Sequence, residues 1–166
     1  MDDLDKKILK SLQNNGRKKN TELARELNVS PSTMLDRVRR IEEQGIVRGY
    51  RADIDPDRLG LTVQAFISVN LDRHEADYIR KFEKGIHSIP YIRACYHLSG
   101  RFDYLLHVAV RDLSRLGDLV KHSIAAIPGV GRTETFLVFS EIKPDVGWPI
   151  EDDGFDASKE TEQGES

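Results

Sequence analysis

A helix start at Ser30 and Pro31 is the feature that most limits how this chain can fold. Serine is a preferred N-cap residue, and proline suits the first helical position because its ring already holds φ near the helical value. Apolar residues at helical spacing continue from this point to Ile41. The sequence therefore predicts a helix that begins at Ser30–Pro31 and ends at Gly45.

Two shorter helical patterns precede this start. One places apolar residues at helical spacing between Leu4 and Leu12, and the other does so between Leu23 and Leu27. The second pattern ends at Leu27, shortly before the helix start at Ser30. A helix-turn-helix needs a short turn of this kind, because its first helix braces on the DNA backbone while the second enters the major groove. A plain three-helix bundle with a charged outer face is the alternative that these residues leave open.

Basic and hydroxyl side chains collect around this predicted recognition helix. Between Arg17 and Arg51 there are nine basic and five acidic residues, although the whole chain has a formal net charge of -3. Arginine reaches guanine edges or phosphates, hydroxyls reach bases or phosphates, and lysine beside a helix start favours phosphate. Asp36 opposes DNA binding unless it pairs with Arg40. The residues expected to contact DNA are Ser30, Ser32, Thr33, Arg37 and Arg40, with Lys18, Lys19 and Arg48 on phosphates.

The remainder of the chain changes from helical to alternating patterns. Apolar residues alternate over 63–71, 92–98, 104–110 and 133–142, which predicts four strands, and helical spacing over 79–86 and 113–127 predicts two helices. The order βαββαβ is that of the ferredoxin-like split βαβ arrangement. The predicted class is thus α+β, with an N-terminal winged helix-turn-helix and a C-terminal βαββαβ ferredoxin-like domain. Apolar residues on both faces of the sheet, including Phe66, Phe136 and Val138, predict dimerisation through the uncovered face.

Pro56 and Gly60 mark a linker between the two domains. The expected boundaries are 1–53 for the DNA-binding domain, 54–61 for the linker, 62–144 for the second domain and 145–166 for a tail. Ile46–Asp53 could form the two short strands of a wing or one strand that pairs with a partner chain. The tail holds eight acidic residues and one lysine, so we expect a disordered, solvated appendage, with competition for the basic patch as the alternative.

Composition points to a cytoplasmic protein without a membrane segment. No apolar run approaches the ~20 residues that span a bilayer, and the acidic N-terminus lacks the apolar core of a secretion signal. Cys95 is the only cysteine, which excludes an intrachain disulfide and fits a reducing compartment.

The turn at Ser99–Gly100–Arg101–Phe102–Asp103 is a second candidate site. A glycine turn can bring backbone N–H groups close to a ligand carboxylate, and the carboxylate of Asp103 could take an ammonium group. Such a pair would suit an amino-acid zwitterion. A plain hairpin turn in which Asp103 accepts local backbone hydrogen bonds is the alternative, which the residues alone favour.

The five histidines lack the spacing of a metal site. His97 and His107 could be cross-strand neighbours on the predicted hairpin, although such a pair is more often structural. The sequence also lacks a phosphate-binding glycine loop, a nucleophile elbow and a catalytic Cys/His set. We therefore expect no metal, no cofactor and no enzymatic activity.

Several motifs, taken in order, resemble the leucine-responsive / asparagine-responsive (Lrp/AsnC) family of transcriptional regulators. They are Asp5–Leu9, Leu23–Ala24, Val29–Thr33, Arg37–Val47, Gly49–Tyr50, Leu59–Gly60, Ser99–Leu106 and Pro128–Val130, with Thr133 and Thr135. The resemblance covers about residues 2 to 144. The family often has proline or cysteine at the positions of Thr33 and Met34, which implies a different base preference here.

The resemblance implies a sequence-specific DNA-binding regulator whose dimers assemble into tetramers or octamers. It also implies that a small effector, usually an amino acid, binds between dimers near the Gly100–Asp103 turn. The effector residues expected on this basis are Ser99, Gly100, Asp103, Thr133 and Thr135. Two alternatives remain: a sirohaem-decarboxylase-like enzyme on the same architecture, with His97 and His107 as its local candidates, and an architectural DNA-binding protein without an effector.

Overall fold

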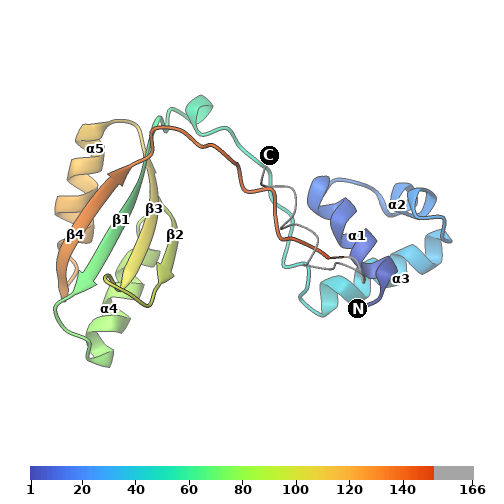
Figure 1. Ribbon diagram of the computed structural model, residues 1–166, viewed down its shortest axis with the longest axis horizontal. Helices are drawn as coiled ribbons and strands as arrows, with labels where there is room; N and C mark the ends of the chain where they lie inside the picture. The colour runs from blue at the N-terminus through green and yellow to red at the C-terminus, as the bar shows by residue number, and fades with distance from the viewer. Residues whose placement is uncertain (152–166) are drawn as a thin grey trace, which may run out of the picture. The chain divides into compact units, whose positions relative to one another are not determined.

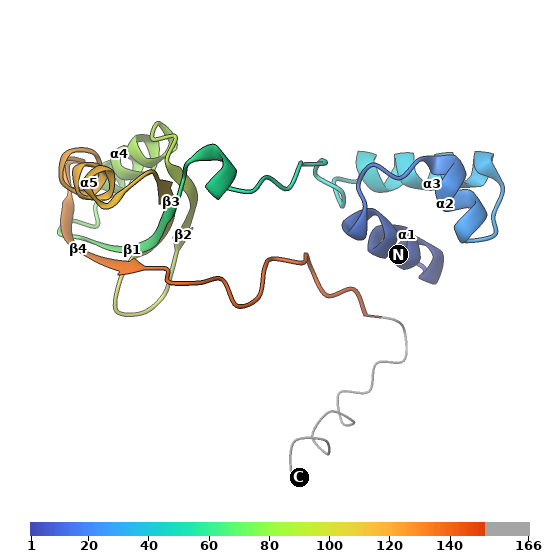
Figure 2. The ribbon, with the colours of Figure 1, turned by 90° about the horizontal axis from the view of Figure 1, so that it is seen from above.

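The computed structural model describes residues 1–151. The chain forms two compact units (Figures 1 and 2). The first comprises Met1–Asp53 together with the described residues from Lys143 onward, and the second comprises Ile54–Ile142. The predicted tail therefore falls partly outside the described residues, and its described part belongs to the first unit.

The first unit is built from three helices, α1 (Asp3–Asn14), α2 (Asn20–Glu26) and α3 (Pro31–Glu43). The predicted start of α3 is confirmed: the Ser30 hydroxyl accepts a hydrogen bond from the backbone N–H of Thr33 at 3.1 Å. This bond satisfies one of the donors that a helix leaves free in its first turn. The apolar faces of the helices meet in one core, whose buried members are Ile8, Leu12, Leu23, Ala24, Met34, Val38 and Ile41.

The turn between α2 and α3 depends on Asn28, which has a φ of +54°. Asparagine tolerates this left-handed conformation better than most residues do. The Val29 N–H then donates to the carbonyl of Ala24 at 2.9 Å, which closes the turn. Residues 46–53 follow α3 and contain no β-strand in the single chain, so a two-stranded intrachain wing is not formed.

The second unit contains four strands and two helical regions. The strands are β1 (Val63–Leu71), β2 (Ile92–His97), β3 (Tyr104–Val110) and β4 (Val130–Leu137). The helices are α4 (Ala76–His87) and α5 (Leu113–Asp118), and a π-helical stretch, η2 (Leu119–Ile124), continues α5. A short 3-10 helix, η1 (Asp57–Leu59), lies ahead of β1. All strand pairs are antiparallel in the order β2-β3-β1-β4, which confirms the predicted ferredoxin-like arrangement.

Both helical regions lie on one side of the sheet (Figure 2). Alternate residues of β1, from Ala65 to Leu71, point to that side and are buried because strand side chains alternate between faces. They pack with Phe82 and Ile86 of α4 and with Leu116 of α5 in a single core.

The opposite face of the sheet is partly apolar and uncovered in the single chain. Phe66 of β1 lies directly opposite Phe136 of β4, and the Phe136 side chain is 43% exposed. On the other side of Phe66, the ring of His107 stacks on it with 4.7 Å between the ring centroids. This face therefore offers aromatic surface that another subunit could bury.

The expectation that His97 and His107 are cross-strand neighbours is wrong. His97 is paired with Tyr104, and His107 with Ala94. Because the connection runs over residues 98–103, the register sets His97 against Tyr104, and His107 lies three positions further along β3. An odd spacing along a strand reverses the face. His97 consequently stacks on the buried Tyr104, whereas His107 lies on the uncovered face with Phe66.

Among residues 1–151, no helix is long and apolar enough to cross a membrane. The same residues contain no group of three or more His, Cys, Asp or Glu side chains that could hold a metal ion.

The environment of His107 predicts a pH dependence. Burial and the nearby Arg93 lower the pKa of His107 from its ordinary value of 6.5, against a smaller opposite effect of Glu141. A histidine with a depressed folded-state pKa contributes stability that is complete above pH 6.5 and is lost as the pH falls through that value toward the folded-state pKa. The Tm of the original protein should therefore fall between pH 7.5 and pH 5.5. In His107→Gln this fall in Tm should be smaller by roughly 2 °C. The other four histidines are common to both proteins, and an equal loss in both would contradict the assignment.

Candidate DNA interface and effector site

Three hydroxyl groups gather at the N-terminus of α3. The Ser30 Oγ lies 3.0 Å from Ser32 Oγ and 2.8 Å from Thr33 Oγ1, and all three residues are exposed. The α3 helix has 13 residues, and its first-turn N–H groups carry the positive end of the helix dipole. Hydroxyls and amides that converge in this way can donate to phosphate oxygens or base edges. The structure thus brings together the three predicted hydroxyl residues.

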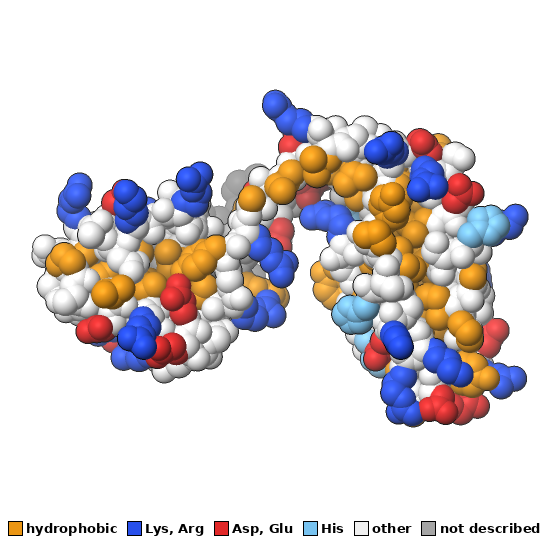
Figure 3. All heavy atoms as spheres, turned by 180° about the vertical axis from the view of Figure 1, so that it is seen from behind, with side chains coloured by type: hydrophobic (Ala, Val, Ile, Leu, Met, Phe, Trp, Pro, Cys, Tyr) orange, Lys and Arg blue, Asp and Glu red, His pale blue; other side chains and the backbone are white. Residues whose placement is uncertain are grey.

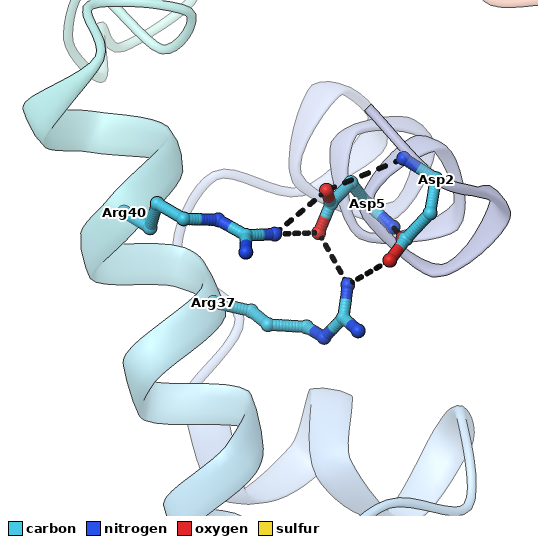
Figure 4. A network of polar contacts seen from close by, with 4 residues as sticks. All are labelled: Asp2, Asp5, Arg37 and Arg40. Carbon is cyan, nitrogen blue, oxygen red and sulfur yellow. Dashed lines mark hydrogen bonds and ion pairs between the residues drawn. The ribbon is translucent and has the colours of Figure 1, made fainter.

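Two predicted DNA-contacting arginines of α3 are tied to α1 (Figure 4). Arg37 Nη1 lies 2.6 Å from an oxygen of Asp2 and 2.8 Å from one of Asp5. Arg40 Nη2 donates to both carboxylate oxygens of Asp5, at 2.9 and 3.1 Å. The hydrogen bonds that Arg37 donates to Asp2 and Asp5 raise the pKa of Arg37, and the one to Asp2 lowers the pKa of Asp2.

The network leaves the two arginines with different access to solvent. The Arg37 side chain is 25% exposed, the Arg40 side chain is 51% exposed, and that of Asp5 is only 7% exposed. A guanidinium has five N–H donors, so an arginine with one occupied nitrogen can still donate elsewhere. Arg40 therefore combines a fixed position with free donors. The ion pair of Arg40 is made to Asp5 of α1 and not to Asp36 of its own helix.

The three predicted phosphate-contacting residues also differ in how far they are exposed to solvent. Lys18 Nζ donates to Ser11 Oγ at 2.7 Å and to Glu26 at 2.6 Å, and its side chain is only 22% exposed. Its hydrogen bond lowers the pKa of Glu26. Lys19 and Arg48 are exposed. Lys and Arg side chains project from this unit in Figure 3.

A groove beside α3 was not predicted from the sequence. It has a volume of about 410 Å³ and joins the predicted Lys18 and Lys19 to Arg39 and Tyr50. The Tyr50 hydroxyl donates to Glu42 at 2.9 Å, and burial together with this carboxylate raises the pKa of Tyr50 to about 12. Tyrosine hydroxyls at such a pKa stay protonated and can donate hydrogen bonds at neutral pH. In the sequence, Lys18 and Lys19 were expected phosphate contacts, whereas Tyr50 stood out only in the Gly49–Tyr50 motif of the family resemblance.

Asp103 fastens the turn of the second candidate site to the sheet. Its Oδ2 accepts from the backbone N–H of Leu71 at 2.8 Å and lies 3.1 Å from His74 Nε2. Its own N–H donates to the carbonyl of Val69, and its carbonyl accepts from Leu98. The local backbone role of Asp103 is therefore present in the single chain. Both side-chain contacts use Oδ2, which leaves Oδ1 without a hydrogen-bond partner within residues 1–151.

The charge of Asp103 suits an ammonium partner. Burial raises its pKa, but the hydrogen bonds from the Leu71 N–H and from His74 outweigh this, so the pKa lies below its ordinary value of 3.8. The carboxylate is consequently ionised at neutral pH.

The remaining predicted effector residues lie around the same end of the sheet. Ser99 and Gly100 are exposed in the turn, where Gly100 has a φ of +143°, a conformation that favours glycine. Thr133 lies opposite Val69 on β1, and the exposed Thr135 lies opposite Ile67.

Strand β1 separates the threonines from Asp103. Among residues 1–151, no hydrogen bond joins the threonines to the turn. The turn instead reaches β4 through Arg101, whose Nη2 lies 3.3 Å from Glu134, and Asn70 holds the Arg101 carbonyl at 2.9 Å. Arg101 belongs to the predicted turn, but neither Arg101 nor Glu134 was among the expected effector residues.

Replacing Asp103 with asparagine should weaken the unit in a pH-dependent way. Because the folded-state pKa of Asp103 is lowered, its contribution is present above its ordinary pKa of 3.8 and is lost as the pH falls through the folded-state value. We expect Asp103→Asn to lower the free energy of unfolding by about 1 kcal/mol at pH 7 and by less at pH 3. Denaturant titrations at both pH values test this. Asp77→Asn, which breaks an exposed pair with Arg80, is the control. An equal effect of the two variants at pH 7 would contradict the role of Asp103 in fastening the turn to β1.

Comparisons with known proteins agree with this geometry. Residues 1–48 match the family model described as winged helix-turn-helix DNA-binding, and residues 64–148 match the model described as Lrp/AsnC ligand binding domain. The leucine-responsive regulatory protein of Klebsiella pneumoniae is 36% identical over 143 residues, which are 86% of this chain and 87% of that protein. The leucine-responsive regulatory protein of Escherichia coli K12 gives the same values.

Solved structures lead to the same family. A transcriptional regulator from Neisseria meningitidis in complex with L-Met superposes with a TM-score of 0.86 at 35% identity, covering 90% of this chain and 96% of that one. AsnC of E. coli superposes with a TM-score of 0.79 at 30% identity, covering 87% and 95%. Because the two family models match residues 1–48 and 64–148 and the relatives cover most of the chain, the chain belongs to the Lrp/AsnC family of transcriptional regulators.

Proposed function

We propose that the chain regulates transcription by placing the N-terminus of α3 in the major groove of double-stranded DNA. The observation that carries this is the exposed hydroxyl cluster of Ser30, Ser32 and Thr33 on the first turn of α3. Ser32 and Thr33 contact bases or phosphates in this proposal, while Ser30 also caps the helix.

Basic residues around the cluster supply the phosphate contacts in the same proposal. They are Lys18, Lys19, Arg37, Arg40 and Arg48. Lys19, Arg40 and Arg48 have the accessible donors that such contacts need. Lys18 and Arg37 are mostly covered, and they would share their donors between DNA and the carboxylates that hold them.

We propose that dimers form through the uncovered face of the sheet and assemble further into tetramers or octamers. Phe66, Phe136 and His107 give this face its aromatic surface. Closed symmetry would set the same residues of two subunits against one another. Two recognition helices would then be presented together to two half-sites.

The effector in this proposal is an amino acid bound between dimers at the turn that Asp103 fastens. The neighbouring structure from N. meningitidis holds L-Met. In this chain the ionised Asp103 suits an ammonium group, and the exposed turn residues Ser99 and Gly100 could offer their backbone N–H groups to a carboxylate. Thr133 and Thr135 would complete the site from β4.

The proposed activity requires no catalysis and places the protein in the cytoplasm with the chromosome. A decarboxylase-like reaction would need histidines in one cavity, but His97 and His107 lie on opposite faces of the sheet.

The DNA-binding proposal is tested on fragments found by genome-wide mapping of bound DNA. The logarithm of the affinity should fall linearly with the logarithm of the salt concentration, by about 0.9 for each phosphate contacted. The double variant Ser32→Ala/Thr33→Ala should bind about tenfold more weakly, because base contacts of this kind are each worth on the order of 1 kcal/mol or more. Arg80→Ala, on α4 of the other unit, is the matched surface control. Salt-independent binding, or full affinity in the double variant, would contradict this use of α3.

The effector proposal is tested by thermal shift against the common amino acids. A ligand at 100 times its Kd should stabilise the protein by about 2.7 kcal/mol. Thr135→Val keeps the side-chain shape but removes the hydroxyl, so it should reduce the shift. Thr21→Val, an exposed change on α2, should keep it. An unchanged response in Thr135→Val would remove β4 from the site, and a lack of response to any amino acid would favour regulation without an amino-acid effector.

A further inference from the structure

The first unit is called the DNA-binding unit below, and the second the sensor unit. The chain returns to the DNA-binding unit after the last strand of the sensor unit. The side-chain amide of Gln13, on α1, makes two hydrogen bonds with the backbone of Trp148. Gln13 Nε2 donates to the Trp148 carbonyl at 2.8 Å, and the Trp148 N–H donates to Gln13 Oε1 at 2.9 Å. The carboxamide thus takes the place of a peptide group in a strand pair, between residues 135 positions apart in the sequence.

The conformation of residues 145–149 suits this contact with Gln13. Gly147 has a φ of +92°, a conformation that favours glycine, and a Cβ at this position would lie 2.4 Å from Gln13 Cδ, so a larger residue would have to displace the Gln13 side chain. The Gly147 N–H donates to the carboxylate of Asp145 at 2.9 Å. Pro149 restricts Trp148 to extended conformations, which reduces the conformational freedom that docking must remove.

The segment lies along a groove of the DNA-binding unit and forms part of its lining through Trp148 and Ile150, with about 720 Å³ left open beside it. The C-terminal half of α1 forms one wall, the residues after α3 form the other, and Ile150 of the segment is half-buried in it. The indole of Trp148 is 77% exposed, so the backbone makes the specific contact. The lining residues of the DNA-binding unit include Leu9, Leu12, Ile46, Val47, Arg48 and Tyr50.

Two stretches of chain connect the sensor unit to the DNA-binding unit, and they leave the sheet side by side. Ala65 of β1 is paired with Leu137 of β4, and the Val138 N–H donates to the Gln64 carbonyl at 3.0 Å. The residues before β1 lead to α3, and the residues after β4 lead to the contact with Gln13.

We propose that residues 143–151 act as a strap that docks on α1 of its own DNA-binding unit and provides a second tether to the sensor unit. A unit held at two points explores fewer orientations than one held by a single linker. The docked strap therefore lowers the entropic cost of setting two recognition helices on DNA and raises the affinity of the oligomer. The second part rests on the proposed DNA-binding function, whereas docking itself does not.

Docking is tested by amide hydrogen exchange on the full chain. In Gln13→Ala, the Trp148 amide should exchange at least about fivefold faster than in the original protein, because its hydrogen-bond acceptor is removed. Gly147→Ala should have the same effect through the clash with Gln13. Asn14→Ala and Val146→Ala are the neighbouring controls and should leave the exchange unchanged. Equal exchange in the original protein and in Gln13→Ala would overturn docking.

The role of the strap is tested by DNA affinity at fixed salt. Gln13→Ala should bind the mapped DNA fragments roughly threefold to tenfold more weakly than Asn14→Ala. The same comparison in a chain ending at Glu151 excludes effects of the acidic residues beyond it. If docking is lost but the affinity is unchanged or higher, the tether is disproved while the DNA-binding function stands. If the original protein binds no DNA, the proposed function and the tether fall together, and the exchange data still decide docking.

Discussion

The DNA-binding unit depends on one buried charge, the carboxylate of Asp5. A buried carboxylate is costly unless it is paired and hydrogen-bonded. Asp5 meets this requirement through Arg37 and Arg40, so the start of α1 and the middle of α3 are held in one arrangement. The same contacts fix where the guanidinium of Arg40 can reach. The residue that positions the recognition surface therefore lies on a different helix, and it is an acid in a unit that binds a polyanion.

The sensor unit uses a comparable device at its sheet. Asp103 joins the turn between β2 and β3 to the end of β1 through the backbone of Leu71 and Val69. Its Oδ1 has no hydrogen-bond partner within residues 1–151, so one residue can serve both the fold and a ligand. A ligand that binds this carboxylate would act on the end of β1. Strand β1 lies between β3 and β4 in the sheet.

Local chemistry made much of the fold predictable. The N-cap at Ser30 and the alternation along β1 depend on neighbouring residues, so the sequence predicted the elements they start or form. The register of the β2–β3 hairpin depends on the length of the connection, which the sequence did not fix, and the expected meeting of His97 and His107 was therefore wrong. The partners of Asp5 and Gln13 lie far along the chain, and no local spacing encodes them. The turn at Gly100–Asp103 was a candidate site from its residues, but these alone favoured an ordinary hairpin, and only the family resemblance made it the expected effector site.

The contact between Gln13 and Trp148 also has a meaning for biosynthesis. Domains generally fold as units in the order in which they leave the ribosome. The three helices of the DNA-binding unit can form as soon as residues 1–53 are available, but the contact on α1 must wait until the chain has been made as far as Trp148. A nascent chain that has not reached Trp148 would carry a formed recognition helix without this contact. The contact therefore forms later than the three helices, only once Trp148 has been synthesised.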